Sequence, residues 1–357
     1  MPTSDSNDNN SVTTLDLTLK LAGADSKVKA DEIFDFIVEA DLDHPDMASV
    51  VLTNDKPQWS AEAHLGDELE LIAGLAGKSA ITIFKGEVTG IEPSYVAGGA
   101  SRVTLRALNR LHRLSRGKKS KTYKNVSDSD LVNKVAQSNS LSVKFGAGTP
   151  SSPTFEHVYQ HNQTDLEFVR LRAARLGYDV WVEDKTLHFE PRHKNESAVE
   201  LSFGTTLEKF QPRLSTANQV SKVSVHGWDW NKKEAIVGSA SSSDGVGLAS
   251  KKGADVANQA FGEAPFLDVD LPVFTQDEAT KIAKSIMRDR MMSYITGDGV
   301  CKGDPDIKVG IVVKVDLGDT RFNGKYYITA VRHRYSHGGQ AGGFHTEFRF
   351  ASDGAGS

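Results

Sequence analysis

FEHVYQHNQTDLEFVRLRAARLGYDVWVEDKTLHFEP, residues 155–191, encodes a helix followed by a hairpin. Thr164 and Glu167 have the spacing of a capping box, in which each side chain accepts a hydrogen bond from a backbone amide at the start of a helix. Gly177 can adopt the left-handed conformation that ends a helix. Between these signals, apolar residues recur at three- and four-residue steps, which predicts one amphipathic helix: Leu166, Val169, Ala173 and Leu176.

The hydrophobic period changes to two directly after Gly177. Residues 178–183 alternate between apolar and polar types, Asp184 and Lys185 form a polar pair typical of a turn, and Leu187 and Phe189 begin a returning strand. The stretch therefore predicts a helix that leads into a β-hairpin.

Length, charge and cysteine content restrict the class of protein. With 357 residues the chain is long enough for two to four domains. A net charge of -5 argues against a general nucleic-acid-binding protein, which usually has a strongly basic balance. Cys301 is the only cysteine, so no internal disulfide can form and the fold is compatible with assembly in a reducing cytoplasm.

The two ends of the chain are polar. Residues 1–11 contain no apolar core segment, so they predict a disordered tail rather than a secretory signal or a membrane anchor. Residues 351–357 are predicted to form a second tail. No apolar run approaches the roughly 20 residues that cross a bilayer, so we expect no stable membrane insertion.

Short apolar runs with glycine turns dominate the first part of the chain and recur near its end. Residues 12–112 therefore predict a first small β-barrel, and strands in residues 201–237 and 296–350 predict a second, discontinuous one. Residues 113–200 between them predict an α/β helix-hairpin domain, in which Ser127 and Asp130 provide another capping box. The predicted fold class is mainly β, with interleaved helical segments.

Residues 238–295 are predicted to be an insertion in the second barrel. Residues 238–245 are rich in glycine and serine, which predicts a flexible loop. A third helix is expected over residues 275–293, because Thr275 and Glu278 form a capping box ahead of an apolar face.

The two predicted barrels also share a pattern. Residues 65–91 and 309–328 each read as a strand, a gap, a turn beginning with Phe84 or Phe322, and a further strand. Glycine turns between β-branched runs look alike in any β protein, so the letters leave a true repeat and a coincidence equally open.

Four segments in succession resemble one known family. They are QHNQTDLEF at 160–168 with Arg170 and Gly177, QVSKVSVHGWD at 219–229, CKGDP at 301–305 with Gly310, and FNGKYY at 322–327. Their order resembles the phage late-control protein D and VgrG family, the hubs of contractile tails, from about residue 14 to residue 350. The resemblance implies a structural role for the residues that match the family motifs. They are Gln160, Asn162, Thr164, Asp165, Phe168, Gly177, Gly227, Trp228 and Gly324.

The resemblance implies a structural baseplate hub. Family hubs carry two similar barrels per subunit, so that a homotrimer forms a pseudo-sixfold ring between a sixfold tail tube and a threefold spike. The implied partners are further copies of the chain, a spike protein, tube initiator and inner tube proteins, and baseplate wedge and LysM-type proteins. The implied location is the baseplate of a phage virion or a phage-like injection particle, assembled in the bacterial cytoplasm. VgrG proteins continue into an oligonucleotide-fold domain and a spike, so here the spike is expected as a separate chain or a missing C-terminal domain.

No motif predicts catalysis, a cofactor or a metal site. His333 and His337 are four residues apart in a segment that reads as strand, where that spacing covers about 13 Å and cannot serve one ion. His157 and His161 have the same spacing, and surface or interface histidines are the better interpretation of both pairs. The acidic group at residues 41–46 lacks the glycine and glutamate of a calcium loop, which favours a solvated turn. Cys301 beside Lys302 is interpreted as structural.

A basic segment forms one candidate partner site. Its positive charges have no acid among them, and they are Arg110, Arg113, Arg116, Lys118, Lys119, Lys121 and Lys124. Contact with an acidic surface of a neighbouring subunit is the favoured interpretation, and phosphate contact with DNA is the alternative.

Two other functions compete with the hub. The first is a cell-wall hydrolase at a tail tip, which sequence alone does not exclude because paired carboxylates suffice for glycoside hydrolysis. The second is a carbohydrate- or receptor-binding β module, for which Trp228 and Trp230 can be interpreted as aromatic platforms. Strand alternation puts both on one face, so the core and a subunit interface are equally open interpretations. Apart from the hydrolase alternative, we predict that the chain has no enzymatic activity.

Overall fold

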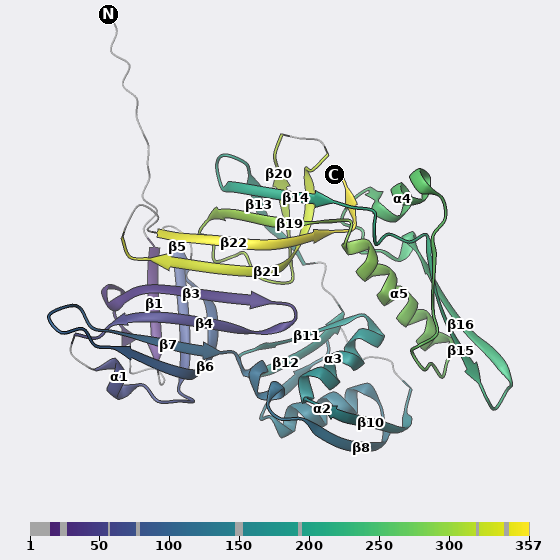
Figure 1. The fold of residues 1–357 in the computed structure, drawn as a ribbon, viewed down its shortest axis with the longest axis horizontal. Helices are drawn as coiled ribbons and strands as arrows, with labels where there is room; N and C mark the ends of the chain where they lie inside the picture. The colour runs from purple at the N-terminus through teal and green to yellow at the C-terminus, as the bar shows by residue number, and fades with distance from the viewer. Residues whose placement is uncertain are drawn as a thin grey trace, which may run out of the picture.

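The computed structural model describes residues 15–21, 27–55, 58–75, 79–146, 153–191, 195–318, 321–338 and 343–356. The predicted tail at residues 1–11 lies outside these ranges. The fold is mainly β, as the sequence predicts, with the longer helices α2 and α3 in one place and α4 and α5 in another (Figure 1).

One 13-stranded sheet runs through the molecule and contains strands from both predicted barrels. The first half contributes β1 (Leu15–Leu21), β2 (Lys27–Val28), β3 (Ile33–Asp41), β4 (His44–Thr53), β5 (Glu68–Leu75), β6 (Ile81–Ser94) and β7 (Arg102–Leu108). The second half contributes β13 (Asn195–Ser202), β14 (Leu207–Leu214), β19 (Ile295–Lys302), β20 (Ile311–Asp316), β21 (Gly324–Ser336) and β22 (Gly343–Ser352). Short helical turns η1 (Ala30–Glu32) and α1 (Trp59–Glu62) flank the first half.

Each half pairs its strands in the same order. The first half runs β1-β5-β6-β7-β4-β3, and the second runs β13-β20-β21-β22-β19-β14. Corresponding strands also follow one another in the same chain order, so the two halves have one topology. They differ at one pair, because β1 is antiparallel to β5 whereas β13 is parallel to β20. The internal pattern in the sequence therefore marks equivalent hairpins, β5–β6 and β20–β21.

The halves are not the two closed barrels that the sequence predicted. In the described parts of the chain, no ladder joins β1 to β3. The reason lies in β3, whose two edges are both occupied: one pairs with β4 and the other pairs with β21 of the second half. A strand has two hydrogen-bonding edges, so β3 joins the halves instead of closing the first one.

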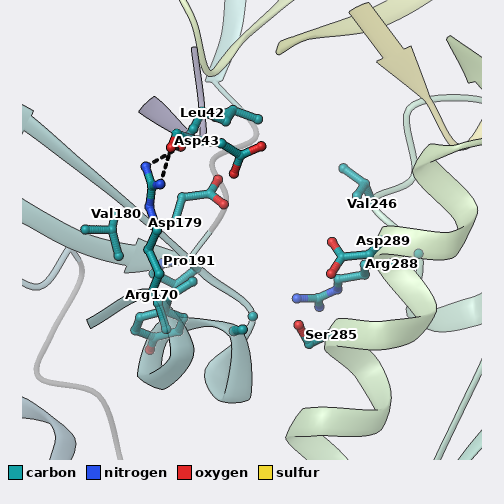
Figure 2. Close-up of a pocket in the computed structure, with 15 residues that line it drawn as sticks. Leu42, Asp43, Arg170, Asp179, Val180, Pro191, Val246, Ser285, Arg288 and Asp289 are labelled. Carbon is teal, nitrogen blue, oxygen red and sulfur yellow. Dashed lines mark hydrogen bonds between the residues drawn. The ribbon is translucent and has the colours of Figure 1, made fainter. Parts of the chain in front are cut away.

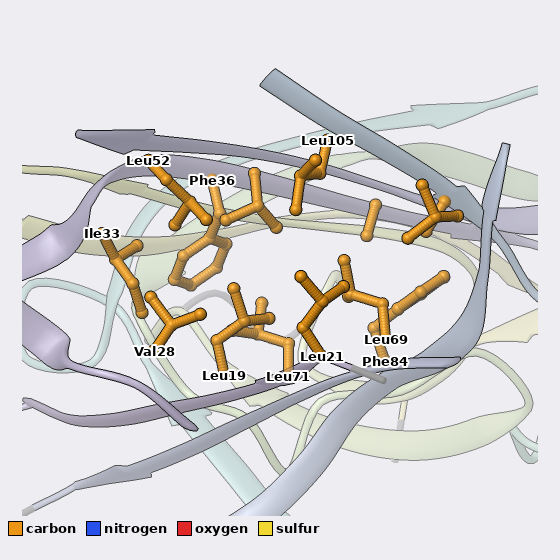
Figure 3. Close-up of a cluster of buried hydrophobic side chains, with 14 of the residues drawn as sticks. Leu19, Leu21, Val28, Ile33, Phe36, Leu52, Leu69, Leu71, Phe84 and Leu105 are labelled. Atoms are coloured by element: carbon orange, nitrogen blue, oxygen red, sulfur yellow. The ribbon is translucent and has the colours of Figure 1, made fainter. Parts of the chain in front are cut away.

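Each half nevertheless curls around its own apolar core. In the first half, alternate residues of β1 and β5 point inward, and Leu19, Leu69 and Leu71 are fully buried beside Phe36 and Leu105 (Figure 3). In the second half, the corresponding core contains Ile295, Val313, Ile328 and Phe350. In both halves, apolar and polar residues alternate along the strands, so one side of each strand lies in the core. This alternation is visible in the sequence.

A helix-hairpin unit lies between β7 and β13. It consists of η2 (Arg110–Ser115), β8 (Lys119–Val126), α2 (Asp128–Ser138), β9 (Ser142–Lys144), β10 (Phe155–Gln163), α3 (Asp165–Leu176), β11 (Tyr178–Glu183) and β12 (Thr186–Pro191). Both predicted capping boxes are present, at Ser127 and at Thr164. Gly177 ends α3 in the left-handed region at φ 69°, and β11 pairs with β12 across the predicted turn.

The insertion in the second half is larger than predicted. It begins after β14 and contains β15 (Lys222–Asp229), β16 (Glu234–Ser241), η3 (Ser242–Asp244), β17 (Lys251–Lys252), α4 (Gly253–Phe261), β18 (Pro265–Asp268) and α5 (Gln276–Met292). The third predicted helix is confirmed as α5, with Thr275 as its N-cap. The predicted capping box is only half formed, because the Glu278 carboxylate accepts from the Phe274 amide and from Arg175 instead of from the Thr275 amide. Residues 222–229, however, were wrongly placed in the second barrel. They form a separate three-stranded sheet, β16-β15-β18, because Val223 and Val225 face α5 in their own core.

Two segments predicted to be irregular are ordered strands. Residues 238–241 belong to β16, since Gly238 allows α5 to pack directly on the strand. The tail predicted at residues 351–357 begins with the end of β22, and β23 (Gly354–Ala355) pairs with β17. The buried Asp353 carboxylate fixes this end by accepting hydrogen bonds from the amides of Gly247 and Leu248, at 2.6 and 3.0 Å.

Candidate functional site

The family-motif residues around α3 form a buried polar cluster. The Asp165 carboxylate accepts hydrogen bonds from Lys119 Nζ at 2.6 Å, Asn139 Nδ2 at 3.0 Å and Gln160 Nε2 at 3.2 Å. Burial alone would raise the pKa of Asp165, but these three donors lower it below its ordinary value. Tyr123 donates to the Gln160 side-chain oxygen at 3.3 Å. The cluster fastens the β8–β10 ladder to α3.

The other motif residues also have structural positions. The ring of Phe168 stacks on Tyr123 with centroids 5.6 Å apart, and the backbone amide of Asn162 donates to Ser120 Oγ at 3.1 Å. Gly227 on β15 lies against Val273, and a β-carbon there would fall 2.3 Å from that side chain. Gly324 begins β21 opposite Val315. Trp228 differs from the rest, since it is exposed.

Three members of the predicted basic segment are neutralised within the chain. Lys119 pairs with Asp165, and Arg113 pairs with Glu87. Arg110 is buried and pairs with acids from three elements. The sequence could not show this, because the acids lie 23 to 74 residues away.

Four members remain on the surface, and we call them the basic strip: Arg116, Lys118, Lys121 and Lys124. They follow β8 and the turn before it. Lys121 lies over the Tyr123 ring at 4.9 Å, and the rest of β8 is exposed except for Tyr123 and Val126. These four side chains are thus exposed, and a partner can reach them.

The Arg110 guanidinium joins the first half of the sheet to the helix-hairpin unit. It donates to Glu87 at 3.2 Å and Glu68 at 2.6 Å in the sheet, and to Asp184 at 2.6 Å in the β11–β12 turn. Lys85 pairs with Glu68 and Asp184 as well. Burial opposes the charge on Arg110, but these partners raise its pKa above the ordinary value. We call this set the junction cluster.

A cavity of about 520 Å³ separates the helix-hairpin unit from α5 (Figure 2). Arg170 of α3 donates to the carbonyls of Leu42 and Asp43 in the β3–β4 turn, which is the acidic turn that the sequence predicted. Ser285, Arg288 and Asp289 face it from α5 (Figure 2). Arg170 therefore ties α3 to the first half, while the cavity leaves a gap toward the insertion.

Arg175 bridges that gap beside the cavity. It donates to the carboxylate of Glu278 near the start of α5 and to the carbonyl of Pro272 at 2.6 Å. Both charged side chains are buried. Breaking a buried ion pair leaves an uncompensated charge and strongly destabilises the fold. The Arg175–Glu278 pair therefore fixes α5 relative to α3.

Asp46 on β4 is a titratable group near the junction cluster. Burial raises the pKa of Asp46 from 3.8 to about 7; the negative charges of Asp41 and Glu183 act in the same direction, and the hydrogen bond from Asn109 opposes them. Because the folded pKa exceeds the unfolded one, folding favours the protonated form. The resulting stability is fully present below about pH 4 and is lost as the pH rises to about 7.

We expect Asp46→Asn to raise the free energy of unfolding at pH 8. One pKa unit corresponds to about 1.4 kcal/mol, and after an allowance for partial exposure the gain should be about 1–2 kcal/mol. At pH 4 the variant and the wild type should unfold alike in urea titrations. Asp255→Asn, an exposed change on α4, is the matched control. A gain of equal size at both pH values would contradict this account.

The histidines and the cysteine do not gather into a reactive site. Within the described ranges, no cluster of three His, Cys, Asp or Glu side chains is placed to hold a metal ion. The surface interpretation of His333 is wrong, because this side chain is buried on β21 and hydrogen-bonds to Thr346 Oγ1 at 3.0 Å. His345 pairs with Glu208. Burial, with Asp304 and Glu208, raises the pKa of Cys301 to about 12, so its thiol is not activated. No helix in the described residues is long and apolar enough to span a membrane.

One side of the three-stranded sheet carries exposed apolar residues among polar ones such as His226 and Ser239. Val223, Val225 and Ile236 point toward α5, so the alternate residues point away from it. Trp228 and Val237 belong to this second side, as does Leu267 of β18, which is in register with Ser224. We call it the outer face.

The sequence identified Trp228 and Trp230 as aromatic platforms, and both are exposed. It missed Leu267 and Val269, which lie in a short segment without a strong strand signal. The alternation of residues 265–269 could have indicated it, but only the pairing of β18 with β15 shows which side is free.

Structures with the same fold are tail proteins and a secretion-system component. The 43 kDa tail protein of prophage MuSo2 from Shewanella oneidensis aligns with a TM-score of 0.66 and 13% identity, over 94% of this chain and 98% of that one. A tail protein from Neisseria meningitidis MC58 also has a TM-score of 0.66, with 14% identity over 96% and 98%. An Escherichia coli type VI secretion system component, described as similar to the phage T4 tail proteins gp27 and gp5, reaches 0.61 with 15% identity over 93% and 76%.

The chain thus has the fold of phage tail proteins. It belongs to the family defined by the Alg8 N-terminal domain, whose model matches residues 14–337. No curated protein matches the sequence.

Proposed function

We propose that the chain is the structural hub of a contractile tail or injection system, resembling the late-control protein D and VgrG hubs. In this role three copies form a ring that joins a sixfold tail tube to a threefold spike. The proposal includes no catalytic activity, because the family-motif residues around α3 serve packing, capping and hydrogen bonding rather than a reactive cluster.

The duplicated strand order carries this proposal. Each chain contains two six-strand halves with one topology, joined edge to edge through β3 and β21. Three such chains contain six similar halves, so a threefold ring presents a pseudo-sixfold surface. A single-copy barrel would offer only three equivalent sites to a sixfold tube.

The similar structures support the kind of particle in which we propose that the chain acts. Two of them are described as tail proteins, one of these from a prophage, and a third is described as a type VI component that resembles gp27 and gp5. The proposed partners are the tube, a spike and the surrounding baseplate proteins, and the proposed place is a phage or phage-like particle assembled in the cytoplasm.

We expect the purified full chain to form a species near three times its 38.7 kDa mass, about 116 kDa, alone or with its spike and tube partners. Native mass spectrometry and mass photometry measure this directly, and electron microscopy should show a ring with six similar lobes. A monomer in every mixture would remove the adaptor function. Clearing of purified cell walls by the trimer would instead support the hydrolase.

The basic strip is expected to contribute to assembly. We expect the triple change of Lys118, Lys121 and Lys124 to Glu to reduce the trimer population or its binding of baseplate partners at least tenfold, since each reversal replaces attraction with repulsion. Lys119 is left unchanged because it pairs with Asp165. Native mass and pull-down at 50 and 300 mM salt provide the measurement.

A matched triple reversal elsewhere controls for net charge: Lys185, Lys251 and Lys325 to Glu. This control should assemble like the wild type. Normal assembly of the strip variant, together with loss of DNA retention in assembled particles, would favour the DNA interpretation instead.

A further inference from the structure

The junction between the two halves uses strands at fixed places in the shared strand order. β3 is the sixth strand of the first half, and it pairs with β21, the third strand of the second half. The sixth strand of the second half is β14, and the third strand of the first half is β6. Within the described parts of the chain, β14 has a ladder only with β19, and β6 has none on its β5 side beyond Glu87. Each chain therefore carries a second set of junction strands whose edges these ladders leave open.

Matching irregularities align β6 with β21. The β6–β7 ladder shifts register just after Val88, and the β21–β22 ladder shifts just after Ile328. The carbonyls of both residues accept a hydrogen bond from a glycine amide, Gly66 at 2.8 Å and Gly310 at 2.9 Å. Val88 and Ile328 are therefore equivalent, and the positions that follow them in β6 and β21 correspond one to one.

β14 aligns with β3 in the same way. The β3–β4 ladder shifts register just after Ile33, and the β14–β19 ladder shifts just after Leu207. Both residues are buried in the core of their own half. Residues 36–40 of β3 therefore correspond to residues 210–214 of β14.

The existing junction completes the core of the first half. Tyr335 of β21 stacks on Phe36 of β3 with ring centroids 5.5 Å apart and packs against that core, in which Phe36 is fully buried. On the other side of the same two strands, Arg332 pairs with Glu39 at 3.1 Å. β21 thus contributes an aromatic ring on the core side and a charge on the opposite side.

The equivalents of these residues lie on the two open edges and are complementary to one another. Phe210, the equivalent of Phe36, is only partly buried, and Tyr95, the equivalent of Tyr335, is 65% exposed. The equivalent register of β14 and β6 brings together an aromatic pair, a pair of opposite charges and an aliphatic pair: Phe210 with Tyr95, Arg213 with Glu92 and Leu214 with Ile91. The charge signs are reversed relative to the existing junction, so the attraction is kept.

Both open edges also carry a proline, Pro212 in β14 and Pro93 in β6, and the equivalent register places the two opposite each other. Ser215 donates to Tyr294 of the β19 side, so alternation points the backbone of Pro212 to the open edge; equivalence with β21 does the same for Pro93. Proline lacks the N–H that a ladder needs and protects edge strands from indiscriminate pairing. Opposite each other, the prolines interrupt a ladder at one pair, whereas a register shifted by two residues interrupts it at two.

We propose that the β14 edge of one copy pairs with the β6 edge of the next copy, in the register that β3 and β21 use within one chain. Main-chain hydrogen bonds on either side of the prolines hold the edges together, and the side-chain pairs give specificity. The contact joins two different surfaces, and such contacts close into a ring when the rotation between copies permits. Figure 1 shows β14 and β6 on opposite sides of the stack of strands, so one copy offers one edge to each neighbour. The inference rests on the proposed ring and assigns its subunit contact, in which all six halves meet through the same kind of strand pair.

The first test exchanges charges across the contact. Under conditions in which the wild type is trimeric, Arg213→Glu should raise the trimer dissociation constant at least tenfold, because two carboxylates then face each other. Glu92→Arg should do the same, and the double variant should restore the wild-type mass in a dilution series by mass photometry. Such a restoration separates a direct contact from a loss of stability. Lys185→Glu, an equal change of net charge in an exposed turn, is the control and should leave the trimer intact.

The second test joins the two edges covalently. Ser94 and Gln211 are opposite each other in the equivalent register, at a non-hydrogen-bonded pair, where Cα atoms are about 4.5 Å apart and a disulfide can form. Under mild oxidation, Ser94→Cys with Gln211→Cys should give covalent dimers and trimers on non-reducing gels, whereas either single variant should give neither. Ser94→Cys with Trp230→Cys, which places the second cysteine on the exposed β15–β16 turn, should also give neither. Cys301 is buried with a raised pKa, so it does not compete.

The outcomes separate the two proposals. A wild-type trimer that survives both charge reversals, or that gives no cross-link between positions 94 and 211, overturns the strand contact and leaves the hub standing. A wild-type monomer in every mixture overturns the hub itself. Cross-linked ladders that extend beyond three copies would support the strand contact and overturn the closed trimer.

Discussion

Arg110→Ala should cost about 3 kcal/mol of unfolding free energy, one of the largest losses available from a single side chain in this protein. Removing one partner of a buried ion pair typically costs 3–5 kcal/mol, because it leaves an uncompensated buried charge. Here the Arg110 guanidinium is the shared partner of Glu68, Glu87 and Asp184. The lower end of the range applies, since Arg113 still pairs with Glu87. Guanidinium chloride or urea titration measures the loss.

The junction cluster gives this change a second readout. Asp184 lies in the β11–β12 turn and Glu68 in the first half of the sheet, so Arg110 spans two units with separate apolar cores. We expect the variant to become sensitive to proteases between residues 108 and 119 before global unfolding, a pattern typical of a loosened junction.

Arg106→Ala is the matched control for the arginine change. Arg106 also makes two hydrogen bonds to one carboxylate, Glu92 at 2.6 and 3.1 Å, but both side chains are about half exposed. Exposed pairs contribute little, so the denaturation midpoint should stay close to that of the wild type. Similar losses for the two variants would show that burial does not distinguish them and would contradict the account of the junction.

Local signals predicted the helices and hairpins of this fold well. The caps at Ser127, Thr164 and Thr275 and the stop at Gly177 depend on neighbouring residues, and the structure has all of them. The sequence predicted the arrangement of the strands in the two halves less well. Whether β3 closes its own half or pairs with β21 depends on residues about 290 positions away, and a two-residue period does not encode partner choice.

The candidate site shows the same division. The sequence placed Trp228 and Trp230 on one face but left open whether that face was buried, and it grouped Arg110 and Lys119 with lysines that lie on the surface. All basic residues of the segment look equivalent in the sequence. Arg110 and Lys119 differ from the others because Glu87 and Asp165, which are far away in sequence, pair with them in the folded chain. The outer face was unreadable in sequence for a related reason, because exposure on β18 depends on which side of the sheet α5 covers.

Gly238→Ala is expected to be the most damaging small substitution, in a segment whose composition is typical of a tolerant loop. An added β-carbon would lie 2.1 Å from the carbonyl carbon of Ala279 and 2.3 Å from the amide nitrogen of Thr280. Backbone atoms of α5 cannot rotate aside as a side chain can, so β16 and α5 must separate. Overpacking of this kind costs about 1–3 kcal/mol, occasionally more, and we expect about 3 kcal/mol.

Gly90→Ala provides the comparison for Gly238. Gly90 also lies within a strand, but its added β-carbon would meet only the Arg106 side chain, at 3.5 Å, which is an ordinary contact. Since alanine restricts the unfolded chain more than glycine does, this change should be neutral or slightly stabilising. If Gly238→Ala were equally neutral in denaturant titrations, α5 would not pack directly on β16.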